Sequence, residues 1–160
     1  MPSRTLVLFL LSGLCLCIAA AADTRAAEQM EDVPAYVGAK ACESCHEDQY
    51  ANFQRHSSKS HSWKSLEKML PKLTAAEQRE CFACHTTGYG KPGGFVSLEQ
   101  TPDKANLSCE TCHGPGSLHY ETGEITAIRR KPDVKGCVTC HNVDRIQNFK
   151  FKPMLYHGGH

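Results

Sequence analysis

The chain has 160 residues, and its 18 Lys and Arg residues nearly balance its 17 Asp and Glu residues, for a formal net charge of +1. This balance argues against a nucleic-acid-binding protein, which would carry a basic patch. No long run of Val, Ile and Tyr is typical of a strand, so we expect no large β-sheet. Ten cysteines are the unusual part of the composition.

An apolar run over residues 6–22 follows Arg4 and ends in four alanines before Asp23. This order predicts a secretory signal peptide at residues 1–22, which leaves one domain at residues 23–160. The alternative is an uncleaved membrane anchor, but the strictly apolar core is shorter than the roughly 20 residues of a span. We expect a soluble periplasmic or otherwise exported protein with no membrane span after cleavage.

Two helices are predicted in the first half of the mature chain. Residues 47–56 place Tyr50 and Phe53 on one helical face, and residues 58–70 carry apolar residues three and four apart. Pro71 is expected to end the second helix.

A third helix and a loop follow. Thr74 and Glu77 have the spacing of a capping box, which predicts a helix that leads into Cys81. The glycine-rich stretch 88–94 predicts turns.

The last third is expected to be irregular. Gly114, Pro115 and Gly116 break the chain, and Ser117 can cap a short helix that carries His119. Residues 123–134 form a connection, and the tail 148–160 is too rich in Pro and Gly for regular structure.

Cys-x-x-Cys-His occurs four times, and we name the copies the first motif (Cys42, Cys45, His46), the second (Cys81, Cys84, His85), the third (Cys109, Cys112, His113) and the fourth (Cys137, Cys140, His141). This pentapeptide attaches c-type haem. Its two thiols share one face of a helical turn, and its histidine is the proximal iron ligand. The sequence therefore predicts four covalently attached haem c groups and an electron-transfer protein.

Two other uses of the cysteines are disfavoured. A disulfide framework suits an exported chain, but it does not require a histidine after every second pair. Zinc ribbons use four ligands and need no such histidines either. Cys15 and Cys17 are removed with the signal peptide, so every remaining cysteine belongs to a motif.

The predicted fold is mainly α with extensive loops and little or no β-sheet, a multihaem cytochrome c fold whose core is wrapped around haem. Motif spacings of 39, 28 and 28 residues indicate a haem array and not a solenoid. Because binding energy is then folding energy, the haem-free chain is expected to be unfolded.

Sixth iron ligands must come from outside the motifs. The candidates are His56, His61, His119, His157 and His160, with Met30, Met69 and Met154 as the methionine alternatives. Met69 fits an apolar helix face better than a ligand role, so bis-histidine ligation is expected at most sites. The basic stretches at 59–72 and 129–131 either offset propionates and solvate a face or dock an acidic redox partner.

Several segments are similar to the tetrahaem cytochrome c554 family. They are Tyr36-Val37-Gly38, Ser60-His61, residues 84–90 with Gly93-Gly94-Phe95, residues 109–117, and the ending from Phe149 to His160. The resemblance implies periplasmic electron transfer, with stacked and near-perpendicular haem pairs, three bis-histidine haems and an open second haem. It also implies distal roles for His119 on the first haem, a tail histidine on the third and His61 on the fourth. We prefer His160 to His157 for the tail ligand, and His56 is left as a spare.

Two functions follow. The first is an electron carrier between redox partner proteins, with a multihaem oxidoreductase or a quinol-linked cytochrome as possible donors. The alternative is an enzyme in which an open second haem converts nitric oxide, nitrite or hydroxylamine. No catalytic residue can be named for it, so the carrier is preferred.

Overall fold

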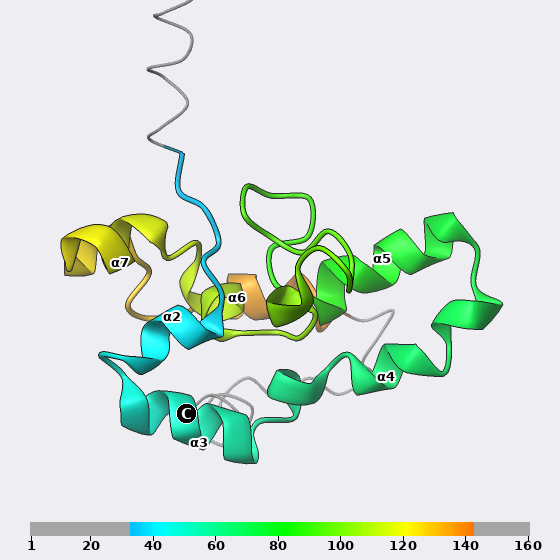
Figure 1. The fold of residues 1–160 in the computed structure, drawn as a ribbon, viewed down its shortest axis with the longest axis horizontal. Coiled ribbons are helices and arrows are strands. Elements are labelled where there is room, and N and C mark those ends of the chain that lie inside the picture. Colours follow the sequence, from blue (N-terminus) through cyan, green and yellow to red (C-terminus); the bar gives the residue numbers. More distant parts are fainter. Residues whose placement is uncertain (1–32, 143–160) are drawn as a thin grey trace, which may run out of the picture. The chain divides into compact units, whose positions relative to one another are not determined.

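Short helices joined by long connections make up the described part of the chain, residues 33–142 of the computed structural model (Figure 1). No strand occurs in these residues. All of them except Val33 fall within the compact unit that begins at Pro34. The prediction of a mainly α fold with extensive loops is confirmed. The predicted signal peptide and tail lie outside the described residues.

The α-helices in chain order are α2 (Ala39–Glu43), α3 (Glu47–His56), α4 (Lys64–Glu67), α5 (Ala75–His85), α6 (Cys109–His113), α7 (Ser117–Thr122) and α8 (Val134–Val138). Single 3-10 turns are η1 (Ser58–His61), η2 (Leu70–Lys72), η3 (Pro102–Lys104) and η4 (Ile125–Ala127). None of the helices between residues 33 and 142 has the length and apolar character of a membrane span.

Two of the predicted helices are found as expected. Helix α3 has the predicted bounds and buries Phe53. Helix α5 begins after Thr74, which forms a capping box with Glu77, and it continues through Cys81 to His85. Local side-chain signals were sufficient here because a capping box satisfies the first free N–H groups of a helix.

The single helix predicted over residues 58–70 is wrong, because the segment is broken into η1, α4 and η2. Serine hydroxyls compete with the helix for backbone groups. Ser57 accepts the N–H of Lys59, and Ser60 donates to the carbonyl of Ser57 at 2.7 Å. Pro71 lies in the first turn of η2 rather than after a helix end.

The predicted helix around His119 is found as α7, but Ser117 is not its cap. Gly116 occupies the N-cap position. The Ser117 hydroxyl instead accepts the N–H of Ala35 at 2.9 Å, which attaches the start of the unit to α7. A long-range hydrogen bond has replaced the local one.

The glycine stretch 88–94 forms turns, as predicted, and packs on Tyr36. The Tyr36 N–H donates to the Pro92 carbonyl at 2.9 Å. Gly88 has a φ of +66°, and a Cβ there would meet the Tyr36 ring at 2.6 Å. A Cβ on Gly94 would overlap the carbonyl of Gly88. Glycine is therefore required where the loop closes on itself and on Tyr36.

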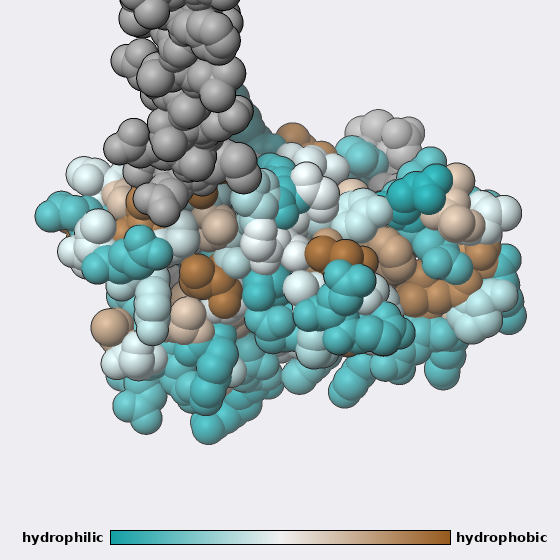
Figure 2. Space-filling model, turned by 45° about the horizontal axis from the view of Figure 1, so that its top comes forward, coloured by the Kyte–Doolittle hydropathy of each residue, from teal (hydrophilic) through white to brown (hydrophobic). Residues whose placement is uncertain are grey.

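The hydrophobic core of the described residues is small. Its central cluster consists of Trp63, Leu66, Phe95 and Ala105, and only Phe53 is a further buried hydrophobic residue. Phe82, which lies inside the second motif, packs on Trp63 and Phe95 with ring centres 5.9 and 5.3 Å away. Figure 2 shows the apolar residues of the visible face in small separate groups among polar ones. The cluster therefore holds the second motif but leaves the other three to polar contacts.

Candidate haem-binding site

Each of the four motifs lies on a helical turn. The second motif ends α5, and the third motif spans α6. The first and fourth motifs begin in α2 and α8 and continue beyond them. There the N–H of His46 donates to the Cys42 carbonyl, and that of His141 to the Cys137 carbonyl, both at 2.9 Å. Residues three apart on such a turn face the same way, so each motif presents two thiols on one side.

The eight motif cysteines are all free thiols, and no disulfide joins them. Cys45 is exposed and the other seven are partly buried. No group of three or more His, Cys, Asp or Glu residues within residues 33–142 is arranged to hold a metal ion. The donor set of each motif therefore matches covalent haem attachment, which needs two free thiols and one imidazole.

The first motif adjoins the third through their leading cysteines. The Cys42 and Cys109 thiols share a hydrogen bond, so they cannot both ionise easily. A thiolate on Cys109 accepts the Cys42 hydrogen, which lowers the pKa of Cys109 and raises that of Cys42. These residues are 67 positions apart, and no local pattern brings them together.

The second motif adjoins the fourth in the same manner. Burial raises the pKa of Cys140 to about 12, and the charge of Cys84 and a hydrogen bond with it contribute to the increase. The thiols thus form two neighbouring pairs, the first motif with the third and the second with the fourth, and Cys112 of the third motif links the pairs because its charge also raises the pKa of Cys140.

Ring hydrogen bonds orient three of the histidines for metal binding. Nδ1 of His113 lies 2.7 Å from the Arg129 carbonyl, and Nδ1 of His119 lies 2.9 Å from the Glu124 carbonyl. Nδ1 of His85 makes a longer contact of 3.4 Å with the Ser62 carbonyl. Because a carbonyl only accepts, Nδ1 carries the hydrogen and Nε2 keeps its lone pair for iron.

Arg129 holds the third motif from outside. Its N–H donates to the His113 carbonyl at 3.0 Å, while its own carbonyl accepts from the His113 ring. Its guanidinium Nη1 donates to the Cys112 carbonyl at 3.3 Å. The sequence had suggested only a basic stretch at this position, and its backbone role becomes visible in the folded chain.

The structure brings together the rings of His46 and His119. Their centres lie 6.3 Å apart and their planes are inclined by 26°. Two imidazoles that bind one metal ion from opposite sides, each through a nitrogen at about 2.0 Å, have ring centres roughly 6 Å apart. The separation of the His46 and His119 ring centres is close to that value.

Ser62 connects the second motif to the segment that precedes the third. Its buried hydroxyl donates to the His85 carbonyl at 2.8 Å and accepts the N–H of Leu107 at 2.9 Å. Its own carbonyl faces the His85 ring. Asn106 adds a second link, because its side-chain oxygen accepts the Trp63 N–H at 2.9 Å.

The remaining predicted ligands are less constrained. His56 ends α3 and His61 ends η1, and both are exposed. Met69 lies between α4 and η2 and is half exposed, so the expectation that it belongs to an apolar helix face is wrong. Met30, Met154, His157 and His160 lie outside the described residues.

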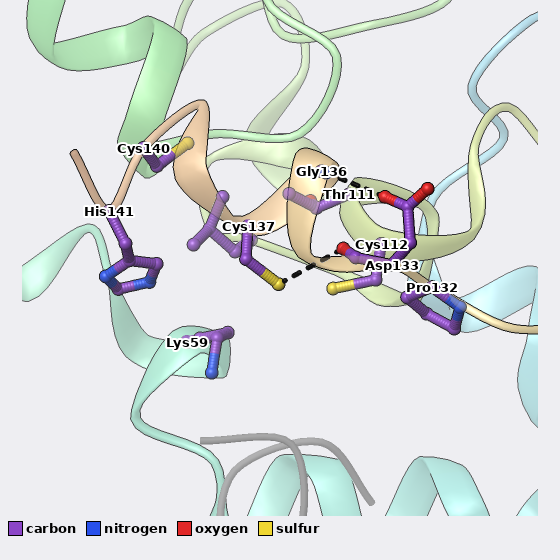
Figure 3. Close-up of a pocket in the computed structure, with 10 residues that line it drawn as sticks. Lys59, Thr111, Cys112, Pro132, Asp133, Gly136, Cys137, Cys140 and His141 are labelled. Carbon is purple, nitrogen blue, oxygen red and sulfur yellow. Dashed lines mark hydrogen bonds between the residues drawn. The ribbon is translucent and has the colours of Figure 1, made fainter. Parts of the chain in front are cut away.

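A cavity lies between the third and fourth motifs (Figure 3). Its lining comprises Lys59, Leu107, Thr111, Cys112, Pro132, Asp133, Gly136, Cys137, Cys140 and His141. Asp133 caps α8 by accepting the Gly136 N–H at 3.0 Å, and its carbonyl accepts from the Cys137 thiol. Burial lowers the pKa of His141, and the Lys59 ammonium lowers it further. Lys59 thus adds positive charge beside these two motifs.

Sequence reasoning did not find Ser62, Arg129 or Glu110 as residues that support the site. Glu110 is 1% exposed inside the third motif and accepts three backbone N–H groups. A carboxylate between two haem cysteines was the available signal, but nothing in the local sequence distinguishes it from the exposed residues around it.

Two comparisons with known proteins bear on this site. The family model for cytochrome c554 and c-prime matches residues 41–114, which contain the first three motifs. Cytochrome c-554 of Nitrosomonas europaea is 30% identical over 96 residues, which are 53% of this chain and 40% of that protein. A chaperone protein DnaJ of Polaromonas naphthalenivorans is 33% identical over 79 residues, 44% of this chain and 18% of that protein. No solved structure matches the chain.

The helical fold and the Cys-x-x-Cys-His turns are those expected of a c-type cytochrome, the class of protein that binds haem c covalently. The chain is thus similar to cytochrome c554 proteins, and the family model matches 74 of its 160 residues. The chain spans two fifths or less of the length of the curated relatives that it matches.

Removal of the Ser62 hydroxyl should destabilise the protein. In Ser62→Ala the partly buried His85 carbonyl and Leu107 N–H lose their shared partner, which should cost about 1–3 kcal/mol of unfolding free energy. Denaturant unfolding of the haem-loaded protein, followed by circular dichroism, measures the change. Ser65→Ala removes an exposed hydroxyl from the next turn and should change stability by about 0.5 kcal/mol or less. Equal losses in both variants would contradict the role of Ser62.

Proposed function

We propose that this protein is an exported tetrahaem cytochrome that carries electrons between redox partner proteins. Haem iron supplies one-electron redox chemistry when it is bound. The observation that carries the proposal is the grouping of four complete attachment turns into two adjoining pairs, in which Cys42 contacts Cys109 and Cys84 contacts Cys140. Attachment points this close favour transfer between neighbouring sites within one chain.

The chain attaches the cofactors and orients their ligands at these sites. The eight motif cysteines tether the cofactors, and His46, His85, His113 and His141 provide the proximal ligands. Carbonyls of Ser62 and Arg129 fix the rings of His85 and His113 with Nε2 available. Such outer hydrogen bonds set ring orientation and raise the basicity of the ligand.

His119 is proposed as the sixth ligand of the first site. Its ring faces that of His46 at a separation that suits one iron, and the Glu124 carbonyl orients it. His61 and His160 are proposed for the fourth and third sites by family resemblance alone. Bis-histidine ligation at these three sites would give low-spin irons.

An exported location is part of the proposal, and it rests on the residues 1–22 that precede the mature domain. Covalent haem attachment takes place outside the cytoplasm, so a signal peptide and the four motifs support each other. We propose partners in the same compartment, among them a multihaem oxidoreductase or a quinol-linked cytochrome as the electron donor.

The purified exported protein should contain four haems. Intact mass spectrometry should give the mass of residues 23–160 plus four haem groups, and the absorption spectrum should show a Soret band. Cys137→Ala with Cys140→Ala removes both thiols of the fourth motif and should reduce the haem count by one. A mass equal to the bare polypeptide would contradict the proposal.

Loss of the His119 ring should open the first site. His119→Ala should convert one further iron from low-spin to high-spin, because no sixth ligand remains beside His46. Electron paramagnetic resonance of the ferric protein counts the spin states. His56→Ala replaces an exposed histidine at the end of α3 and should leave the spectrum unchanged. An unaltered spin count in His119→Ala would rule out the assignment.

The enzyme alternative depends on an open second site, at which a nitrogen oxide or hydroxylamine could bind. Carbon monoxide tests for such a site because it binds reduced five-coordinate haem. If the second haem is open, carbon monoxide should change the spectrum by the amount expected for one haem out of four. Turnover of nitrite or hydroxylamine by such a protein would favour the enzyme over the carrier. No spectral change would exclude the enzyme and leave the carrier.

A further inference from the structure

Glu110 is a buried carboxylate inside the third motif. Its side chain is 1% exposed. Oε1 accepts the N–H groups of Val37 at 2.9 Å and Gly116 at 2.7 Å, and Oε2 accepts that of Gly38 at 2.8 Å. Three donors therefore converge on one carboxylate from two segments that are more than 70 residues apart.

The arrangement fits the ionised form of Glu110. An ionised carboxylate only accepts hydrogen bonds, and a backbone N–H only donates them. The salt bridges found in residues 33–142 join Lys40 to Glu43 and Lys104 to Asp103, and neither includes Glu110. The negative charge is thus held by peptide dipoles, which satisfy its hydrogen bonds without neutralising it.

This charge lies where the first and third motifs meet. Glu110 follows Cys109, whose thiol is hydrogen-bonded to that of Cys42. The Glu110 charge acts on neighbouring groups. Burial raises the pKa of Tyr36, and the Glu110 charge raises this pKa further. The pKa of Cys42 is also raised. The largest cause is its hydrogen bond with Cys109, and the Glu110 charge is a smaller one.

The fourth motif has the opposite charge nearby. Burial raises the pKa of Cys137, and the Lys59 ammonium acts against this increase. Lys59 also lines the cavity that contains Cys137 and Cys140. Lys59 also acts on Cys112 of the third motif, so the third motif lies between the buried Glu110 anion and the Lys59 cation, while the fourth has Lys59 beside it.

We infer that Glu110 is a fixed negative charge that lowers the reduction potential of the cofactors attached to the first and third motifs. This inference rests on the proposed tetrahaem carrier. Reduction adds one electron from a redox partner to an iron and lowers the iron charge by one, with no proton required from Glu110. A nearby anion opposes that step. Electrons are thereby biased from this pair of sites toward the second and fourth motifs.

The size of the effect follows from Coulomb's law. A unit charge acting over roughly 10 Å through an effective dielectric constant of about 20 changes an equilibrium constant by about tenfold. For a one-electron couple, a tenfold change corresponds to 59 mV. Removal of the charge should therefore be visible in a redox titration.

Glu110→Gln removes the charge with little change in volume, and Glu43→Gln is its matched control. Glu43 occupies the same position in the first motif, but its side chain is 33% exposed and paired with Lys40. Spectropotentiometric titration of the haem-loaded proteins should show four reduction steps. In Glu110→Gln, the equilibrium constant for reduction should be about tenfold larger than in the wild type for two of these steps. In Glu43→Gln, no reduction equilibrium constant should change by as much as threefold. Equal shifts in both variants, or none in Glu110→Gln, would overturn the inference.

Glu110→Asp serves as the second variant, because the glutamine amide could prevent folding by pointing an N–H at backbone donors. Aspartate keeps the charge, so its four transitions should stay close to those of the wild type. Infrared spectra recorded between oxidised and reduced protein should contain a carboxylate band that changes frequency in Glu110→Asp. Identical difference spectra in wild type and Glu110→Asp would reject the inference without any need for the glutamine variant.

The two proposals fail separately. A protein with fewer than four haems by mass contradicts the tetrahaem carrier before any potential is measured. A protein with four haems whose potentials do not respond to Glu110→Gln contradicts only the role of Glu110.

Discussion

The Cys-x-x-Cys-His turn is the constraint on which the structure depends. Each turn must present two thiols on one side and an imidazole below them, and the chain meets this demand four times with helical segments of five to eleven residues. Helices this short are not stable alone in water. Tertiary contacts must therefore stabilise them, and the type of contact differs among the four turns.

Apolar packing supports the second motif, and polar contacts support the third. Phe82 joins the second motif to the aromatic cluster around Trp63 and Phe95. Glu110 and Arg129 instead fasten the third motif through backbone hydrogen bonds to distant segments. Few hydrophobic residues are buried in this part of the chain, so hydrogen bonds to peptide groups determine much of the loop structure. The proposed haem groups would add apolar surface to this small core, because binding energy is then folding energy.

Prediction succeeded where the signal was local. The capping box of Thr74 and Glu77, the bounds of α3 and the turns at 88–94 all follow from residues within a few positions of one another. It was wrong for residues 58–70, where apolar spacing suggested one helix. There Ser57, Ser60 and Ser62 bond to backbone groups, and one of them reaches as far as Leu107. Ser117 misled the prediction for the same reason, since its hydroxyl bonds to Ala35.

The sequence alone determined the cofactor chemistry, because thiol spacing and the adjacent histidine lie within five consecutive residues. It also indicated a helical, loop-rich chain, because few strand-like or strongly apolar segments occur. Only the tertiary structure decided which motifs adjoin, that His119 faces His46, and that Glu110 is buried while Glu43 is not. The paired motif cysteines are 56 and 67 positions apart, and the hydrogen bonds that bury Glu110 join residues more than 70 positions apart; no periodicity in the sequence records such contacts.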